Sequence, residues 1–165
     1  MLVLGIDPGT AITGYGLVRE DRAGLTLLDC GVVTTPAGHP LPERLQAIYQ
    51  GLASVIQEHQ PEAAAVEELF FSRNVRTALS VGHARGVTLL CLADAGLPVF
   101  EYKPLEVKQA VAGYGGADKR QVQEMVRMLL ELDSVPQPDD AADAVAVAVC
   151  HIHSARMLAL MADAE

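Results

Sequence analysis

The sequence contains no tryptophan, and aromatic residues supply only 4% of its 165 positions. Apolar residues still make up 50% of the chain, so its core must be built from valine, leucine, isoleucine and alanine. Such a core favours helices packed tightly on a sheet. A chain of this length is typical of one domain, which buries roughly 70% of its unfolded surface. We therefore expect a single domain over residues 1–165.

Cysteine is scarce, and long hydrophobic runs are missing. Cys30, Cys91 and Cys150 are odd in number and form no CxxC pair, a pattern typical of reduced thiols in a cytosol. No apolar stretch approaches the ~20 residues that span a bilayer, and no basic region precedes the first strand pattern. These features predict a cytoplasmic protein without a membrane partner.

Positive charge is also in short supply, since the formal net charge is −9. This balance argues against a nucleic-acid partner, but the distribution of charge weakens the argument. Residues 67–127 hold eight bases and seven acids, whereas the remaining residues hold four bases and fourteen acids. A neutral to basic middle beside acidic ends is compatible with DNA binding on one face and equally with an ordinary solvated surface.

Hydrophobic periodicity predicts alternating strands and helices. Asp118, followed by Gln121 three residues later, resembles a capping box at the start of one helix. The overall order indicates an α/β fold with a five-stranded mixed sheet flanked by helices. Strands are expected at residues 2–7, 13–19 and 25–35, as an antiparallel meander, and at 63–67 and 97–102. Helices are expected at 40–60, 75–95, from 104, from 118, and from 139 or 140 to about 157.

Two carboxylates end apolar strand patterns. Asp7 follows the run from Met1 to Ile6, and Glu67 closes the short run that begins at Ala63. An ionised carboxylate stays near a core only when it is paired or bound to a metal, so both positions indicate a ligand site. The competing interpretation places Asp7 in a turn and Glu67 at an exposed strand end.

A second pair of carboxylates opens the last predicted helix. Asp140 and Asp143 are three residues apart, so they share one helix face near the positive end of the helix dipole. Asp139 and Asp143 also share a face by this spacing, and either Asp139 or Asp140 can serve as the helix cap. Oxygen ligands without cysteine or histidine at zinc spacing select Mg²⁺ or Mn²⁺. Two such ions about 4 Å apart can cleave a phosphodiester by in-line displacement.

Six short motifs occur in order along the chain. They are Leu4–Gly16, Val66–Phe71 with Asn74, Gly82–Gly86, Val107–Gln109, Asp118–Lys119 and Asp140–Ala144. Together they resemble the motifs of the bacterial Holliday junction resolvase family RuvC. The resemblance implies a ribonuclease H-like fold of the retroviral integrase superfamily and Mg²⁺-dependent paired nicking of four-way DNA junctions. It further implies a homodimer, two Mg²⁺ ions per active site with Mn²⁺ able to substitute, and a RuvA–RuvB branch-migration complex as partner.

The same resemblance assigns roles to individual residues. It implies that the catalytic, metal-binding carboxylates are Asp7, Glu67, Asp140 and Asp143, which leaves Asp139 as the cap. Phe70 resembles the aromatic residue that stacks on a base near the crossover, an interaction that contributes roughly 1–3 kcal/mol. Lys108 and Lys119 match positions that contact the DNA backbone. Arg73 and Arg76 are weaker candidates for DNA contacts.

Other functions share parts of this pattern. The segment from Gly5 to Thr10 also resembles the phosphate loop of sugar kinases and Hsp70-like ATPases, but no second such loop or Walker motif follows. Another ribonuclease H-like nuclease, such as the YqgF type that acts in RNA processing, is a closer alternative. A non-catalytic junction-binding module is the third, and the four carboxylates argue against it.

Overall fold

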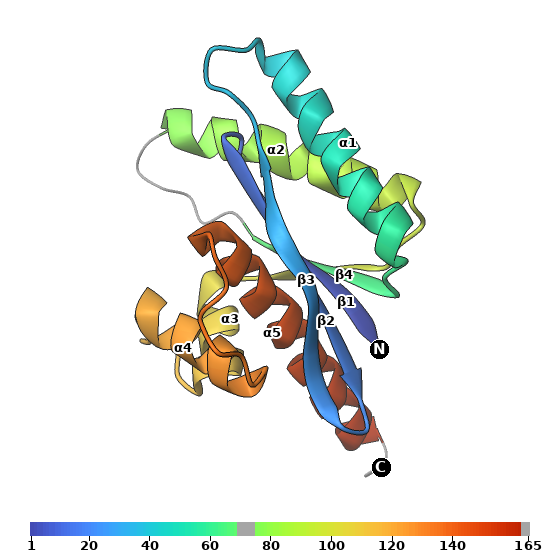
Figure 1. The fold of residues 1–165 in the computed structure, drawn as a ribbon, viewed down its shortest axis with the longest axis vertical. Coiled ribbons are helices and arrows are strands. Elements are labelled where there is room, and N and C mark those ends of the chain that lie inside the picture. The colour runs from blue at the N-terminus through green and yellow to red at the C-terminus, as the bar shows by residue number, and fades with distance from the viewer. Residues whose placement is uncertain (69–74, 163–165) are drawn as a thin grey trace.

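The computed structural model describes residues 1–68 and 75–162, and its elements follow the expected order (Figure 1). The strands are β1 (Leu2–Asp7), β2 (Ile12–Asp21), β3 (Gly24–Thr34), β4 (Ala63–Glu67) and β5 (Val99–Tyr102). The helices are α1 (Leu41–His59), α2 (Val75–Asp94), α3 (Pro104–Ala112), α4 (Lys119–Leu129) and α5 (Asp139–Ala162).

The strands form one five-stranded mixed sheet, as the sequence predicts, and their order is β3-β2-β1-β4-β5. β1 pairs antiparallel with β2, and β2 pairs antiparallel with β3, which confirms the meander. β4 lies parallel to β1, and β5 lies parallel to β4. Because β1 and β4 are parallel neighbours, their carboxyl ends meet at the same edge of the sheet.

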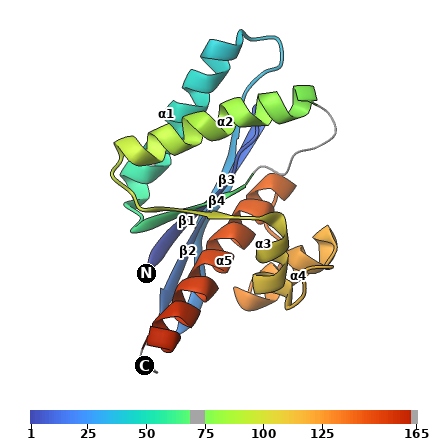
Figure 2. The same ribbon diagram turned by 180° about the vertical axis from the view of Figure 1, so that it is seen from behind.

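Helices cover both faces of the sheet (Figures 1 and 2). α1 and α2 lie on one face, and α5 lies on the other with α3 and α4 beside it. Side chains along β1 alternate between the two faces of the sheet. Leu4 and Ile6 join the core under α1 and α2, and Val3 joins the core under α5. The core is aliphatic throughout, as the scarcity of aromatic residues requires.

Glycines in β1 and β2 allow α5 to lie unusually close to the sheet. A Cβ atom on Gly5 would overlap the carbonyl oxygen of Ala144, and one on Gly16 would overlap the backbone of Val145. The facing stretch of α5 is completely buried, and its small side chains suit this close approach. Because these glycines have no side chains, α5 can pack directly against the backbone of β1 and β2.

Some element ends differ from the expected ones. The fifth strand begins at Val99 rather than at residue 97, because Leu97 still donates its backbone N–H to the carbonyl of Leu92 at the end of α2. The last helix continues past residue 157 to Ala162, and Met157 in this extension is 65% exposed. The helix therefore continues beyond its contact with the sheet.

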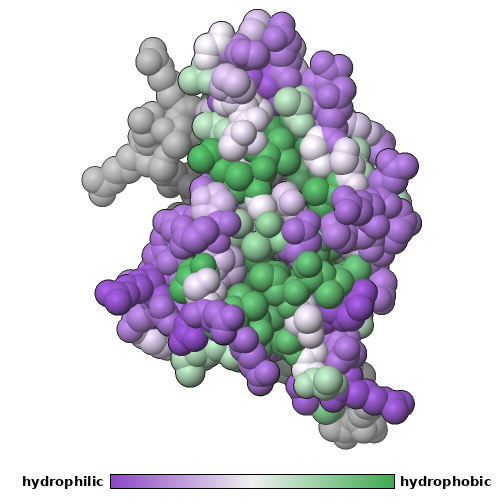
Figure 3. All heavy atoms as spheres, viewed as in Figure 1, coloured by the Kyte–Doolittle hydropathy of each residue, from purple (hydrophilic) through white to green (hydrophobic). Residues whose placement is uncertain are grey.

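The surface is mixed in character. In the space-filling view, hydrophobic residues gather in the middle of the face and hydrophilic residues surround them (Figure 3). Among the helices of the described ranges, none combines the length and the apolar character that crossing a bilayer requires. Cys30, Cys91 and Cys150 are free thiols.

Candidate active site

Asp7 and Glu67 end two parallel strands side by side. Ile6 pairs in register with Val66, so the next residue on each strand is one of these two carboxylates. Alternation turns both side chains towards α5, because Ile6 and Val66 belong to the core on the opposite face. The sheet therefore brings together two acids that are sixty residues apart in the sequence.

The start of α5 brings the second pair of acids to the same edge. A Cβ atom on Gly14, which pairs with Asp7 across the β1–β2 ladder, would overlap the carbonyl oxygen of Asp140. Asp143 follows one helical turn later and lies close enough to raise the pKa values of both Asp7 and Glu67 by repulsion. The four carboxylates singled out from the sequence thus lie together in the structure.

Nearby lysines only partly offset the burial and repulsion of the two strand carboxylates, because Lys119 lowers the pKa of both and Lys108 lowers that of Glu67. Burial, followed by repulsion from Asp143 and Asp140, raises the pKa of Asp7 to about 6. Burial, followed by repulsion from Asp7 and Asp143, raises the pKa of Glu67 to about 7. A site whose acids repel one another in a partly dehydrated pocket is stabilised by a bound cation.

Lys119 supplies the nearest positive charge to the helix pair. Its Nζ atom lies 2.8 Å from Asp143 Oδ2 and 3.3 Å from Asp139 Oδ2. Burial raises the pKa of Asp143, while the hydrogen bond and charge of Lys119 oppose this increase. The lysine begins α4 directly after the cap residue Asp118, so α4 is the element that carries it into the site.

Asp139 does not cap α5, contrary to our prediction. The helix begins at Asp139 itself, and the carbonyl of Pro138 accepts the backbone N–H groups of Ala141 and Ala142. The Asp139 carboxylate is instead paired with Lys119. Spacing alone does not distinguish these arrangements, because capping and ion pairing both place an acid at a helix start.

The donor set fits a hard divalent cation. Every candidate ligand is a carboxylate oxygen, and such donors suit Mg²⁺ or Mn²⁺ rather than zinc. Within residues 1–68 and 75–162, no three aspartate, glutamate, histidine or cysteine side chains converge closely enough to hold an ion in their present conformations. Asp143 explains part of this spread, since its carboxylate is directed to Lys119.

A cavity of about 190 Å³ opens beside the carboxylates. Glu67 and Asp143 line it together with Lys108 and Lys119, and the remaining walls are largely apolar. Both lysines matched from the sequence are therefore at the site, on α3 and α4. Ammonium groups beside the carboxylates suit a phosphate backbone that must approach a negatively charged centre.

A polar network fixes the loop that follows Asp7, and no sequence pattern pointed to it. The Thr10 side chain donates to the carbonyl of Ser80 on α2, and the Thr35 side chain donates to the carbonyl of Thr10. Arg44 Nε donates to Thr35 Oγ1 at 2.9 Å, and its Nη2 donates to the Thr10 carbonyl at 3.1 Å. The network holds the loop after Asp7 against α1 and α2.

Three of the expected DNA contacts cannot be placed by their side chains. Phe70 and Arg73 fall outside the described residues. Arg76 belongs to α2, but its side chain is likewise outside the described part of the structure. Their roles stay predictions.

The two histidines of α5 turn to different neighbours. His151 is buried, and its Nδ1 atom shares a 2.8 Å hydrogen bond with the hydroxyl of Tyr102. His153 Nδ1 lies 3.0 Å from the carbonyl oxygen of Ala110 on α3. Each histidine ties α5 to a neighbouring element, and the two do not converge on one point.

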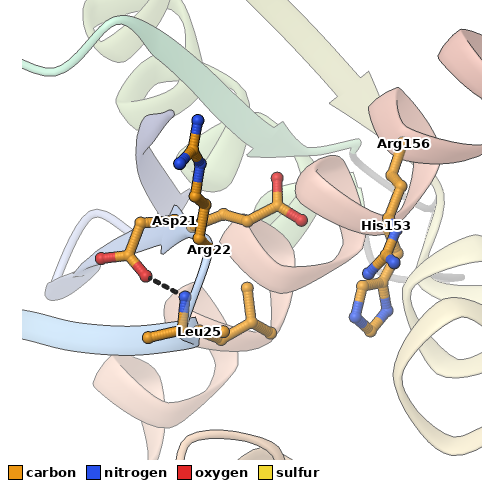
Figure 4. Close-up of a pocket in the computed structure, with 8 residues that line it drawn as sticks. Asp21, Arg22, Leu25, His153 and Arg156 are labelled. Carbon is orange, nitrogen blue, oxygen red and sulfur yellow. Dashed lines mark hydrogen bonds between the residues drawn. The ribbon is translucent and has the colours of Figure 1, made fainter.

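A different pocket, of about 320 Å³, lies at the opposite end of β1, where the β2–β3 hairpin meets α5 (Figure 4). Arg22 and Arg156 line it, but so do acids, and Asp21 already accepts the backbone N–H of Ala23 at 2.8 Å. The side chain of Arg22 points away from His153 and Arg156 (Figure 4). This pocket has neither a uniform charge nor converging groups, so the carboxylate edge is the better candidate.

Comparison with known proteins points to one family. The sequence model of the family "Crossover junction endodeoxyribonuclease RuvC" matches residues 3–151. The RuvC of Chloroflexus aggregans is 64% identical over 158 residues, which cover 96% of each chain. The RuvC of Desulfitobacterium hafniense is 58% identical over 99% of each chain.

A solved structure extends the similarity to three dimensions. Thermus thermophilus RuvC, in complex with a Holliday junction substrate, superposes with a TM-score of 0.90. It is 43% identical, and the match covers 95% of this chain and 96% of that one. The ribonuclease H-like fold expected from the sequence is confirmed, and the chain belongs to the RuvC family of crossover junction endodeoxyribonucleases.

Proposed function

We propose that this protein resolves four-way DNA junctions in recombination and repair by paired, symmetric nicks. The observation that carries the proposal is the meeting of Asp7, Glu67, Asp140 and Asp143 at one edge of the sheet. Family membership over nearly the whole chain supports it, as does the bound junction in the Thermus relative. The protein would act in the bacterial cytoplasm, where its DNA substrate lies.

The four carboxylates would hold two Mg²⁺ ions, with Mn²⁺ able to replace them. Asp7 lies between the other acids and would contact both ions, Glu67 would complete one site, and Asp140 and Asp143 would complete the other. Bound there, the ions supply Lewis-acid stabilisation of the charge that develops on the phosphodiester. No serine, cysteine or other protein nucleophile is needed for this hydrolysis.

The lysines would position the substrate strand. Lys108 faces the same cavity as Glu67, where its ammonium group can pair with a backbone phosphate. The network from Arg44 through Thr35 to Thr10 would hold the loop after Asp7 and thereby the direction of the Asp7 carboxylate. These residues bind and orient, while the carboxylates hold the metal.

A homodimer would supply the second nick. A junction has near two-fold symmetry, so a C2 dimer presents one centre to each of two symmetry-related strands. α2 supports this assembly, because Leu79 is 62% exposed and Leu90 is 55% exposed on its surface. The RuvA–RuvB branch-migration complex would be a further partner, as the family resemblance implies.

The test is cleavage of a synthetic four-way junction with a mobile core, compared with linear duplex and with an RNA–DNA hybrid. Reactions in Mg²⁺, Mn²⁺ and EDTA establish the metal requirement. We expect paired nicks on opposing strands of the junction alone, and only with metal. Cutting confined to the hybrid would indicate an RNA-processing nuclease, and tight junction binding without cutting in either metal would indicate a binding module.

A further inference from the structure

Lys119 is shared between two aspartates at the start of α5. Its ammonium nitrogen lies 2.8 Å from Asp143 Oδ2 and 3.3 Å from Asp139 Oδ2. Asp143 is a proposed metal ligand, whereas the Asp139 side chain is 59% exposed and has no place in the proposed ligand set. One lysine therefore joins a metal-binding acid to an acid outside the metal centre.

The ammonium group and a divalent cation compete for the same carboxylate. A cation bound to Asp143 would repel a positive charge held within hydrogen-bonding distance of that carboxylate. Hence Lys119 must leave Asp143 before this acid can turn towards the metal, and Asp139 offers it a second partner nearby. Metal binding then replaces the Lys119–Asp143 ion pair, while Lys119 keeps Asp139 as its partner.

The backbone around Lys119 is held, so the exchange requires only side-chain motion. Asp118 Oδ1 accepts the backbone N–H of Gln121 at 2.9 Å, and Gln121 Oε1 accepts the backbone N–H of Asp118 at the same distance. The Tyr114 hydroxyl donates a hydrogen bond to Gln121 Oε1 at 2.8 Å. With its α-carbon anchored in this capping box, the lysine can swing between partners without moving α4.

We propose that Lys119 is a placeholder cation, which pairs with both Asp143 and Asp139 in the metal-free protein and retains only Asp139 when Mg²⁺ binds. Asp139 is then a positioning residue, since it retains the ammonium group beside the centre, where a DNA phosphate can approach. This inference rests on the proposed function, because it takes Asp143 as a ligand of Mg²⁺.

The test is the affinity of the full-length, DNA-free protein for Mg²⁺, measured by isothermal titration calorimetry. Lys119→Met should tighten Mg²⁺ binding by about two- to fivefold, the range that a partly exposed ion pair contributes. Arg120→Met removes an exposed positive charge one residue further along and is the matched control. It should change the affinity much less. Unchanged or weaker binding by Lys119→Met would overturn the placeholder role.

A double-mutant cycle tests the role of Asp139. Asp139→Asn should weaken Mg²⁺ binding when Lys119 is present, and it should have a smaller effect when combined with Lys119→Met. If Asp139→Asn weakened Mg²⁺ binding equally with and without Lys119, Asp139 would act only through its negative charge. Its positioning role would then be refuted. Asp133→Asn, at another exposed acid, controls for net charge.

Two further outcomes separate this inference from the proposed function. If the wild-type protein binds no Mg²⁺ or Mn²⁺, the proposed function fails together with the inference. If it binds metal and cuts junctions while Lys119→Met leaves the affinity unchanged, only the placeholder role fails. Thermal unfolding in EDTA verifies that each variant is folded.

Discussion

The two halves of the carboxylate site are held in different ways. Asp7 and Glu67 end neighbouring strands in the sheet, and burial and mutual repulsion raise their pKa values. The helix half is more exposed, and Lys119 pairs with Asp143 within it. The strands thus provide a fixed half in which burial and repulsion outweigh the nearby lysines, and the helix provides an adjustable half with a directly paired cation. A metal site assembled in this way can be tuned at the helix without disturbing the sheet.

Removing the charge of the fixed half should have the largest effect. Asp7→Asn should retain junction binding and reduce cutting by about a thousandfold or more, because a lost metal contact removes several kcal/mol of transition-state stabilisation. Single-turnover cleavage and gel-shift assays on the same junction measure the two effects. Asp133→Asn serves as a surface control. Substantial cutting by Asp7→Asn, in a preparation whose metal content has been verified, would show that Asp7 is not part of the metal centre.

The raised pKa values of the fixed half predict a pH effect on stability. Asp7 and Glu67 bind protons more tightly in the folded protein than in the unfolded chain, so their contribution is complete below about pH 4 and is lost as pH rises through about 6 to 7. Each shift should lower the free energy of unfolding on the order of 3 kcal/mol over this window in EDTA.

Urea unfolding at several pH values measures this loss. The double variant Asp7→Asn with Glu67→Gln should flatten the pH dependence, and Mg²⁺ should do the same for the wild-type protein. An identical slope for the wild-type protein and the double variant would assign the pH dependence to other groups. His151 would not be one of them, because burial lowers its pKa and its contribution to stability rises with pH.

Changing the distance between the two halves should have an intermediate effect. Gly14→Ala places a methyl group against the carbonyl of Asp140 and should cost about 1–3 kcal/mol of stability through overpacking. It should also weaken Mg²⁺ binding, since α5 must shift from the sheet edge. Gly38→Ala is the control, because a Cβ there meets nothing within 4 Å. Chemical denaturation and Mg²⁺ titration of both variants provide the comparison.

The smallest effect is expected from loosening the helix half alone. Asp118→Ala removes the N-cap of α4 and should cost about 1 kcal/mol of stability. Lys119 should then be less well positioned, so cutting should fall modestly while the pH dependence from Asp7 and Glu67 persists. If Asp118→Ala instead abolished that pH dependence, the two halves would not be independent. Urea unfolding across pH measures both quantities.

Much of the fold was predictable because its signals are local. The strand at 63–67 agrees with β4 residue for residue, and the capping box of Asp118 and Gln121 is present as expected. The meander also follows the predicted order, because turn residues and alternation specify neighbouring antiparallel strands. Element ends such as the start of β5 were less accurate, since they depend on contacts rather than on periodicity.

The candidate site was predictable in its acids and less so in its other residues. A carboxylate at the end of an apolar strand is unusual enough to be noticed, as Asp7 shows. Arg44 and Thr35 are ordinary residues in sequence, and their link to the Asp7 loop depends on how α1 packs. Asp139 was misassigned because a helix start favours an acid whether it caps the backbone or pairs with a lysine of another helix.

The sequence alone determined which residue types form the site and which elements carry them, because both depend on local periodicity and on the cost of burying charge. Tertiary structure decided how the acids are divided between partners. Lys119 reaches Asp139 and Asp143 only because α4 packs beside the start of α5, and α5 reaches Asp7 only because Gly5, Gly14 and Gly16 leave room for it. Such contacts join residues far apart in the chain, so no local pattern encodes them.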